Sequence, residues 1–334
     1  MKNWKKVMAM GLAGVMAVGC LAGCGSSSDS STAAGSTTAA KESDGNVKIA
    51  YIVKAKTDEF WTTMESGAYA YAEEVGVDLE FQAPEKESDV EKQVQMIENA
   101  VIKGFDAIVL SAADSTAVIP SIVKANNAGI PVILVNDTID MDELEAQGGK
   151  VETYVGISQY DAAKQAGDYA AENIEDGKVL YLEGNPGVQA LDDRLAGFKD
   201  QVDFEVVASQ TAKCDRNEAY SVMQNVLNAN PEVNVVWTVN AEMGQGAIQA
   251  IEQTGTDHDI AVFDFDASSD DLAAIEAGTL TGTVAQYPNK QAEGAIQACL
   301  DVLDGKTLEE HTETPSLLVT ADNLADYKAE MGIE

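Results

Sequence analysis

Polar side chains with planar groups recur at or beyond the ends of the short apolar runs of this chain. The residues concerned are Asp58, Asn136, Asp137, Arg194, Asn240, Asp266 and Gln286. Carboxylates and amides can each pair with two neighbouring hydroxyl groups, and a guanidinium donates several hydrogen bonds in a fixed fork. Phe60 and Trp61 offer flat apolar surfaces on which a ring can lie. These residue types suit the binding of a small polyhydroxylated ligand.

The apolar runs alternate with amphipathic stretches in a regular order. The first set predicts strands over 47–53, 77–81, 107–110, 131–135 and 151–156, with helices over 60–75, 88–103 and 115–127. The second set predicts strands over 178–182, 204–209, 233–239, 260–265 and 281–286, with helices over 159–174, 191–201, 215–229, 243–253 and 269–277. Short, wholly apolar strands separated by helices indicate parallel sheets that are buried on both faces. The fold class is therefore α/β, with two doubly wound parallel-sheet lobes, and the polar residues lie where such sheets bind ligands.

The first residues have the features of an export signal. Three lysines precede an apolar run over 7–18, which is shorter than the ~20 residues of a spanning helix. Leu21-Ala22-Gly23-Cys24 then resembles the end of a bacterial lipoprotein signal, whereas Cys20 lacks the leucine three residues before it. We expect residues 1–23 to be removed and Cys24 to carry lipid. Residues 24–45, rich in Ser, Thr, Ala and Gly, predict a flexible tether.

Composition excludes several classes of function. The net charge is −35, and the leader holds three lysines and no acids, so its removal makes the chain more negative still. Such a surface repels nucleic acid and anionic lipid headgroups. The two histidines, His258 and His311, have no nucleophile motif beside them, and no metal-ligand spacing occurs. Gln249 replaces the third glycine of a dinucleotide fingerprint. We expect no enzyme activity, no metal and no cofactor.

A series of short motifs extends over most of residues 47–320. They are Asp58-Glu59-Phe60-Trp61 with Gly67-Ala68, Gly104-Phe105-Asp106-Ala107-Ile108, Gly129-Ile130-Pro131-Val132, Arg194 with Gly197-Phe198, Val222-Met223-Gln224-Asn225-Val226-Leu227, Asn240-Ala241-Glu242-Met243, Phe265-Asp266 and Ala285-Gln286-Tyr287-Pro288. Each motif is weak alone, but the order is specific. In this order of motifs, the chain resembles ribose/galactose-type periplasmic binding proteins, the type I solute-binding components of ABC sugar importers.

The resemblance implies a division of the chain and a mechanism. The chain would cross between lobes near 152–157, 284–289 and 314–320, which gives an N-terminal lobe of 46–154 plus 287–313 and a C-terminal lobe of 155–286 plus 314–334. The lobes would close over ligand at a hinge. The resemblance also implies ligand contact for Asp58, Phe60, Trp61, Asn136, Asp137, Arg194, Asn240, Asp266 and Gln286. We expect a monomer that is lipid-anchored outside the cell membrane of a Gram-positive bacterium and delivers its ligand to an ABC permease.

Two departures from the family pattern bear on the ligand. Asp137 stands where ribose-binding relatives have arginine, and Cys214 stands where they can have an aromatic residue. Ribose is therefore a doubtful ligand. Few cations among many acids argue against anionic ligands, so a neutral sugar or polyol fits best, with an amino sugar second. A nucleoside or a signalling furanose, presented by a sensor to a membrane receptor, is the alternative.

Overall fold

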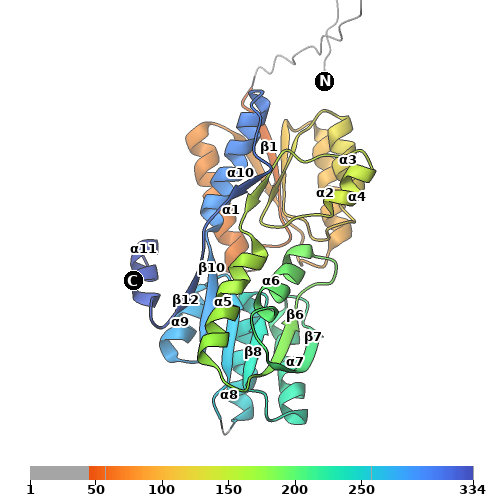
Figure 1. Cartoon of the computed structure of the whole chain (residues 1–334). Helices are drawn as coiled ribbons and strands as arrows, with labels where there is room; N and C mark the ends of the chain where they lie inside the picture. Colours follow the sequence, from red (N-terminus) through yellow and green to blue (C-terminus); the bar gives the residue numbers. More distant parts are fainter. Residues whose placement is uncertain (1–44, 57, 257, 334) are drawn as a thin grey trace, which may run out of the picture. The chain divides into compact units, whose positions relative to one another are not determined.

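The computed structural model describes residues 45–56, 58–256 and 258–333 (Figure 1). The predicted signal peptide, the predicted lipidation site Cys24 and all but the last residue of the predicted tether lie outside the described residues. Among the helices that are described, none is both long and apolar enough to cross a membrane.

The first sheet contains six parallel strands. In spatial order they are β11 (His311–Glu313), β5 (Tyr154–Gly156), β4 (Val132–Val135), β3 (Ala107–Leu110), β1 (Lys48–Ile52) and β2 (Asp78–Gln82). Alternate residues of β1 pack on opposite faces, so that Tyr51 joins the core under α1 (Glu59–Val75) and α10 (Pro288–Leu303). Ile52 joins the core under α2 (Val90–Lys103) and α3 (Ile119–Asn127). Helices thus cover both faces, and Figure 1 shows α1 beside α10.

The second sheet also contains six strands. Their order is β12 (Ser316–Thr320), β10 (Gly282–Gln286), β9 (Ala261–Phe265), β8 (Val235–Thr238), β6 (Lys178–Glu183) and β7 (Glu205–Thr211). One core lies under α5 (Gln159–Asn173) and α6 (Gln189–Lys199) and centres on Trp237, whose ring stacks on Phe198 at 4.5 Å. The opposite core lies under α7 (Arg216–Ala229), α8 (Ala241–Thr254) and α9 (Ser269–Ala277).

The chain passes between the two sheets three times: between β5 and α5, between β10 and α10, and between β11 and β12. The predicted fold class of two doubly wound lobes is therefore confirmed. Three details differ from the sequence prediction. Strand β12 was not predicted as a strand and runs antiparallel to β10. The helices α4 (Met141–Ala146) and α11 (Leu324–Met331) were not predicted. Neither were α10 and β11.

Close helix packing in the second lobe depends on a glycine. A Cβ atom on Gly197 of α6 would lie 2.2 Å from the carbonyl oxygen of Tyr160 in α5. That contact is with backbone, which cannot move aside as a flexible side chain can. Gly197 therefore allows the two helices to approach each other.

We predict that Gly197→Ala destabilises the protein, because α5 and α6 must separate to admit the methyl group. The expected loss is roughly 1–3 kcal/mol of unfolding free energy, the usual cost of overpacking. Urea denaturation measures it. Gly294→Ala in α10 is the matched control, since its Cβ would meet only a Val155 methyl at 3.0 Å. Equal stability of the Gly197→Ala variant and wild type would contradict the packing argument.

Candidate functional site

A small cavity lies between the two lobes, at the carboxyl ends of their strands. Its wall is formed by Lys54, Asp58, Phe60, Trp61, Glu87, Asn136, Leu191, Arg194, Cys214, Asn240 and Asp266. The cavity volume is about 20 Å³, which is room for one water molecule, whereas ligand pockets usually exceed about 300 Å³. A neighbouring opening of about 180 Å³ shares Asp58, Phe60, Asn240 and Asp266 with it. The inner cavity is therefore too small for a sugar-sized ligand in this conformation.

Asp58 places the aromatic residues. Its Oδ1 accepts a hydrogen bond of 3.1 Å from the backbone nitrogen of Trp61, which caps the N-terminus of α1. Phe60 and Trp61 therefore lie in the first helical turn, with their rings edge to face at 4.8 Å. The indole Nε1 of Trp61 donates to Glu87 Oε1 at 3.1 Å. The aromatic surface is thus held by hydrogen bonds at both ends.

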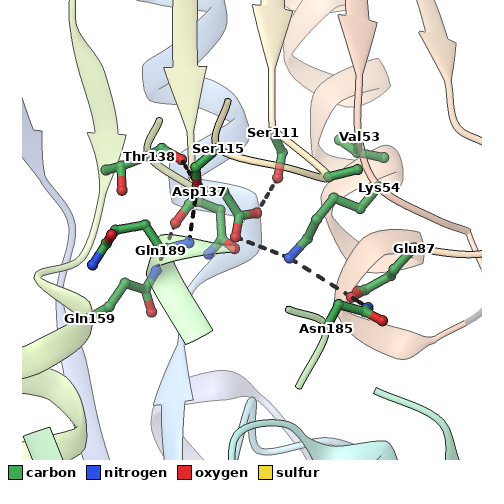
Figure 2. A network of polar contacts seen from close by, with 12 residues as sticks. Val53, Lys54, Glu87, Ser111, Ser115, Asp137, Thr138, Gln159, Asn185 and Gln189 are labelled. Carbon is green, nitrogen blue, oxygen red and sulfur yellow. Dashed lines mark hydrogen bonds and ion pairs between the residues drawn. The ribbon is translucent and has the colours of Figure 1, made fainter. Parts of the chain in front are cut away.

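A buried ion pair lies beside the cavity (Figure 2). Lys54 Nζ is 3.0 Å from Asp137 Oδ1 and 3.9 Å from Glu87 Oε2. Ser111 donates to the other oxygen of Asp137. Burial alone would lower the pKa of Lys54, but the two carboxylates outweigh burial and hold that pKa above its usual value. Asp137, a predicted ligand contact, does not line the cavity, because its carboxylate is turned to Lys54 and Ser111.

A second polar chain joins the two sheets. Arg194 Nη1 lies 3.6 Å from Asp266 Oδ1, which also accepts from Gln286 Nε2 at 2.7 Å. Gln286 Oε1 in turn accepts from Asn136 Nδ2 at 2.8 Å. Arg194 is fixed further by hydrogen bonds of 2.8 Å to Gln159 and to the carbonyl of Val239. The guanidinium is therefore buried and held by two hydrogen bonds and one ion pair.

Several of these residues have unusual backbone conformations. Asn136 has φ 61° and Asp266 has φ 93°, in the region that normally requires glycine. Such strain persists only where surrounding contacts hold it, and it concentrates at functional sites. Asn240 instead caps α8, where its Oδ1 accepts from Met243 at 3.1 Å.

The structure gathers most of the predicted ligand contacts. Asp58, Phe60, Trp61, Asn136, Arg194, Asn240 and Asp266 line the inner cavity, and Gln286 lines the adjoining opening. The sequence did not lead us to predict Lys54, Glu87 or Leu191 as site residues. Nor did we predict a ligand contact for Cys214. Glu87 follows the second strand, so the strand-end rule could have found it. Lys54 directly follows the first predicted strand, 47–53, so the same rule could have found it too; what the sequence did not indicate is its pairing with Asp137, 83 residues away.

Polar contacts cross between the lobes around the cavity. Glu59 Oε2 accepts from both the backbone nitrogen and the hydroxyl of Ser269, at 3.0 and 2.5 Å. Elsewhere Ser115 donates its backbone N–H to Gly187 at 2.8 Å, and its hydroxyl accepts from the backbone of Gln189 at 3.0 Å (Figure 2). These contacts join one lobe to the other directly.

Comparisons with known proteins agree with this geometry. Residues 49–307 match the family described as "Periplasmic binding protein domain". The chain is 33% identical to the ribose import binding protein of Bacillus subtilis, over 83% of this chain and 89% of the relative. It is 32% identical to the fructose import binding protein of Bifidobacterium longum, over 95% and 94%. A solute-binding protein of Actinobacillus succinogenes with bound D-allose superposes with a TM-score of 0.79 at 31% identity, covering 84% of this chain and 100% of that one.

The cavity makes stability depend on pH through Asp58. Burial, followed by the charge of Glu87, raises the pKa of Asp58 to about 8. An unfolded aspartate has a pKa of about 3.9, so the folded protein holds a proton that the unfolded chain releases between those values. This contribution to stability is fully present below about pH 4 and is lost as the pH rises through about 8.

We predict that Asp58→Asn flattens this part of the pH dependence, because asparagine caps the helix without ionising. Urea midpoints measured from about pH 5 to pH 9 test the prediction. Asp140→Asn, the same change at the exposed N-cap of α4, is the matched control for loss of a capping carboxylate. An unchanged slope in the Asp58 variant would show that the prediction is wrong.

Proposed function

Because this chain belongs to the periplasmic binding protein domain family, we propose that it captures a monosaccharide or related polyol between its lobes. Its relatives are named as import binding proteins for ribose and fructose, not as enzymes. The observation that carries the proposal is the cavity itself: amide, carboxylate and guanidinium groups from both lobes converge beside the rings of Phe60 and Trp61. That combination suits hydroxyl groups around an apolar ring face.

The charges of the cavity favour a neutral ligand. Lys54 is paired with Asp137 and Arg194 with Asp266, so neither cation is available to neutralise a buried anion. The raised pKa of Asp58 leaves that carboxyl largely uncharged near neutral pH. An amino sugar is the second candidate, because Glu87 lines the cavity beside Asp58 and could pair with an ammonium group, whose charge would also favour ionisation of Asp58.

We also propose that the protein, anchored by lipid, delivers its ligand to a membrane partner. We assign 46–154 plus 287–313 to one lobe and 155–286 plus 314–334 to the other, with lipid on Cys24 as the anchor outside the membrane. A permease of an ABC importer would receive the ligand from the closed form, and tethering would raise the effective concentration at that partner. The alternative partner is a membrane sensor, and neighbouring permease or histidine kinase genes would distinguish the two.

We predict that one class of compound stabilises the protein against heat. Unfolding and refolding first strip any bound ligand, and the panel then contains neutral sugars, polyols, amino sugars and nucleosides. At 1,000 times its Kd, a ligand adds about 4 kcal/mol, which raises the midpoint by several degrees. No shift with any sugar, polyol or amino sugar would contradict the proposed function.

Asp266→Ala should abolish that ligand-induced shift, since it removes the carboxylate on which Arg194 and Gln286 converge. Asp270→Ala is the matched control: Asp270 lies four residues further on and pairs with Arg216 at the surface, where an ion pair contributes little. An intact shift in the Asp266 variant would remove this residue from the site.

Glu59→Gln should weaken ligand binding mainly through faster dissociation, because the interlobe contact with Ser269 forms in the closed state. The amide oxygen of glutamine can still accept both hydrogen bonds, so only the charge is lost at an exposed contact, which is about 0.5–1 kcal/mol or roughly 2- to 5-fold in Kd. Stopped-flow dissociation measures it, with Glu65→Gln in the same helix, a partner of exposed Lys56, as control. Equal dissociation rates in the two variants would contradict the assigned role of Glu59.

A further inference from the structure

Two buried carboxyl groups in the second lobe take no part in the cavity. Asp264 is in the middle of β9 and is fully buried, and neither of its carboxyl oxygens has a hydrogen-bond donor in good geometry among the described residues. Helix α8 passes over it at Gly244, where a Cβ atom would lie 2.1 Å from Asp264 Oδ2. A buried carboxylate without donors is costly, so this environment favours the protonated acid.

The neighbouring carboxyl, Asp271, has the opposite environment. It is equally buried, but Oδ1 accepts from Gln245 Nε2 at 2.8 Å and Oδ2 accepts from the backbone nitrogen of Ser268 at 2.8 Å. Ser268 and Asp271 form a reciprocal capping box at the start of α9. Burial raises the pKa of Asp271 to about 6, but the hydrogen bonds from Gln245 and Ser268 oppose this rise and leave the ionised form favoured at neutral pH. An acid at Asp264 beside a carboxylate at Asp271 is a matched donor and acceptor.

These two residues flank a strained segment of the site. Asp266 and Ala267 both have left-handed backbone conformations, with φ of 93° and 50°. The backbone nitrogen of Ala267 is held by the Thr283 hydroxyl at 3.1 Å, and Thr283 lies opposite Asp264 in the β9–β10 register. Asp266 contacts Arg194 and Gln286, while Ser269 contacts Glu59 of the other lobe. Something outside the segment must hold this conformation.

We propose that Asp264 and Asp271 share one proton, carried on Asp264, and that the resulting hydrogen bond positions residues 266–269 for ligand binding and lobe closure. The pair ties β9, on one side of the segment, to the start of α9 on the other. The role of this segment in ligand binding rests on the proposed function, but its positioning by the pair does not.

The charged groups around the pair agree with this assignment. Burial, then the Asp271 carboxyl, raises the pKa of Asp264 well above its usual value, and Asp266, which directly follows the strand, adds to the rise. The Thr283 hydroxyl on β10 acts in the opposite sense. From α8 and α9, Glu242 and Asp270 are already paired with Arg216 at the surface. Loss of the proton would leave two buried like charges, so the segment should be ordered below the pKa of the pair and loosen as the pH rises through it.

The test needs no ligand, so its failure and failure of the proposed function are distinguishable. NMR of the full chain, labelled at the aspartate carboxyl carbons and backbone nitrogens, follows Asp264 and the exchange of the Ala267 and Ser268 amides. Rates are corrected for the intrinsic effect of pH. In wild type we expect Asp264 to stay protonated at neutral pH, and amide protection to fall about tenfold for each pH unit above the pKa of the pair.

Three variants complete the test. Asp264→Asn keeps a donor that cannot ionise, so protection should persist at alkaline pH. Asp264→Ala removes the donor and should lower protection at every pH. Asp161→Asn, at the equivalent capping position after Ser158 in α5, should leave the wild-type profile unchanged. If Asp264 titrates in the acid range, or if the Asn variant keeps the alkaline loss of protection, the proposal is overturned; both results stand even if the Ala variant does not fold.

Discussion

The contact between Arg194 and Asp266 organises the middle of the cleft. Both side chains are largely buried, and their closest atoms are 3.6 Å apart. Removing either charge would leave the other unpaired in a poorly hydrated site, which typically costs several kcal/mol. The hydrogen bonding around the pair is completed by Gln159, Gln286 and Asn136. The bonds through Gln286 and Asn136 extend this network from the second sheet to the first. The strained conformations of Asn136 and Asp266 follow from this arrangement, because both residues must leave their strands and turn toward the same space.

Compensation of buried charge also limits the ligand. Lys54 is neutralised by Asp137 in the same way as Arg194 is by Asp266, so the cavity presents hydrogen-bonding groups without a free cation among its described lining residues. The helix N-termini reinforce this design. Asp58 and Asn240 each use one oxygen to cap a helix, which fixes the side chain before ligand arrives. Preorganised polar groups of this kind lose little entropy on binding.

The fold could be predicted from sequence because its strands are short, apolar runs. Strand β3 was predicted at its observed bounds, 107–110, and every one of its residues is buried. Two of the elements that were missed lack a comparable signal. Strand β11 is wholly exposed and exists because β5 provides its hydrogen-bonding partner, while α11 has no side-chain cap and buries only Leu324 and Tyr327.

The site was predictable for a different reason and to a different extent. The strand-end rule found residues whose place depends on the sheet alone, such as Asn240 and Asp266. It could not find pairings between distant segments. Asp137 was expected to face ligand, but its carboxylate forms an ion pair with Lys54, which lies at the end of another strand. Whether a polar residue at a strand end serves the ligand or a neighbour depends on tertiary contacts, which local patterns do not contain.

The central claim is that the two lobes close on a bound sugar. Spin labels at exposed Glu91 of α2 and Asn228 of α7, one on each lobe, would report the distance between them by pulsed electron resonance. The account predicts a broader, longer distance distribution in ligand-free protein and a shorter, narrower one at saturating concentration of a sugar that binds. A distribution that does not change when such a sugar is bound would contradict it.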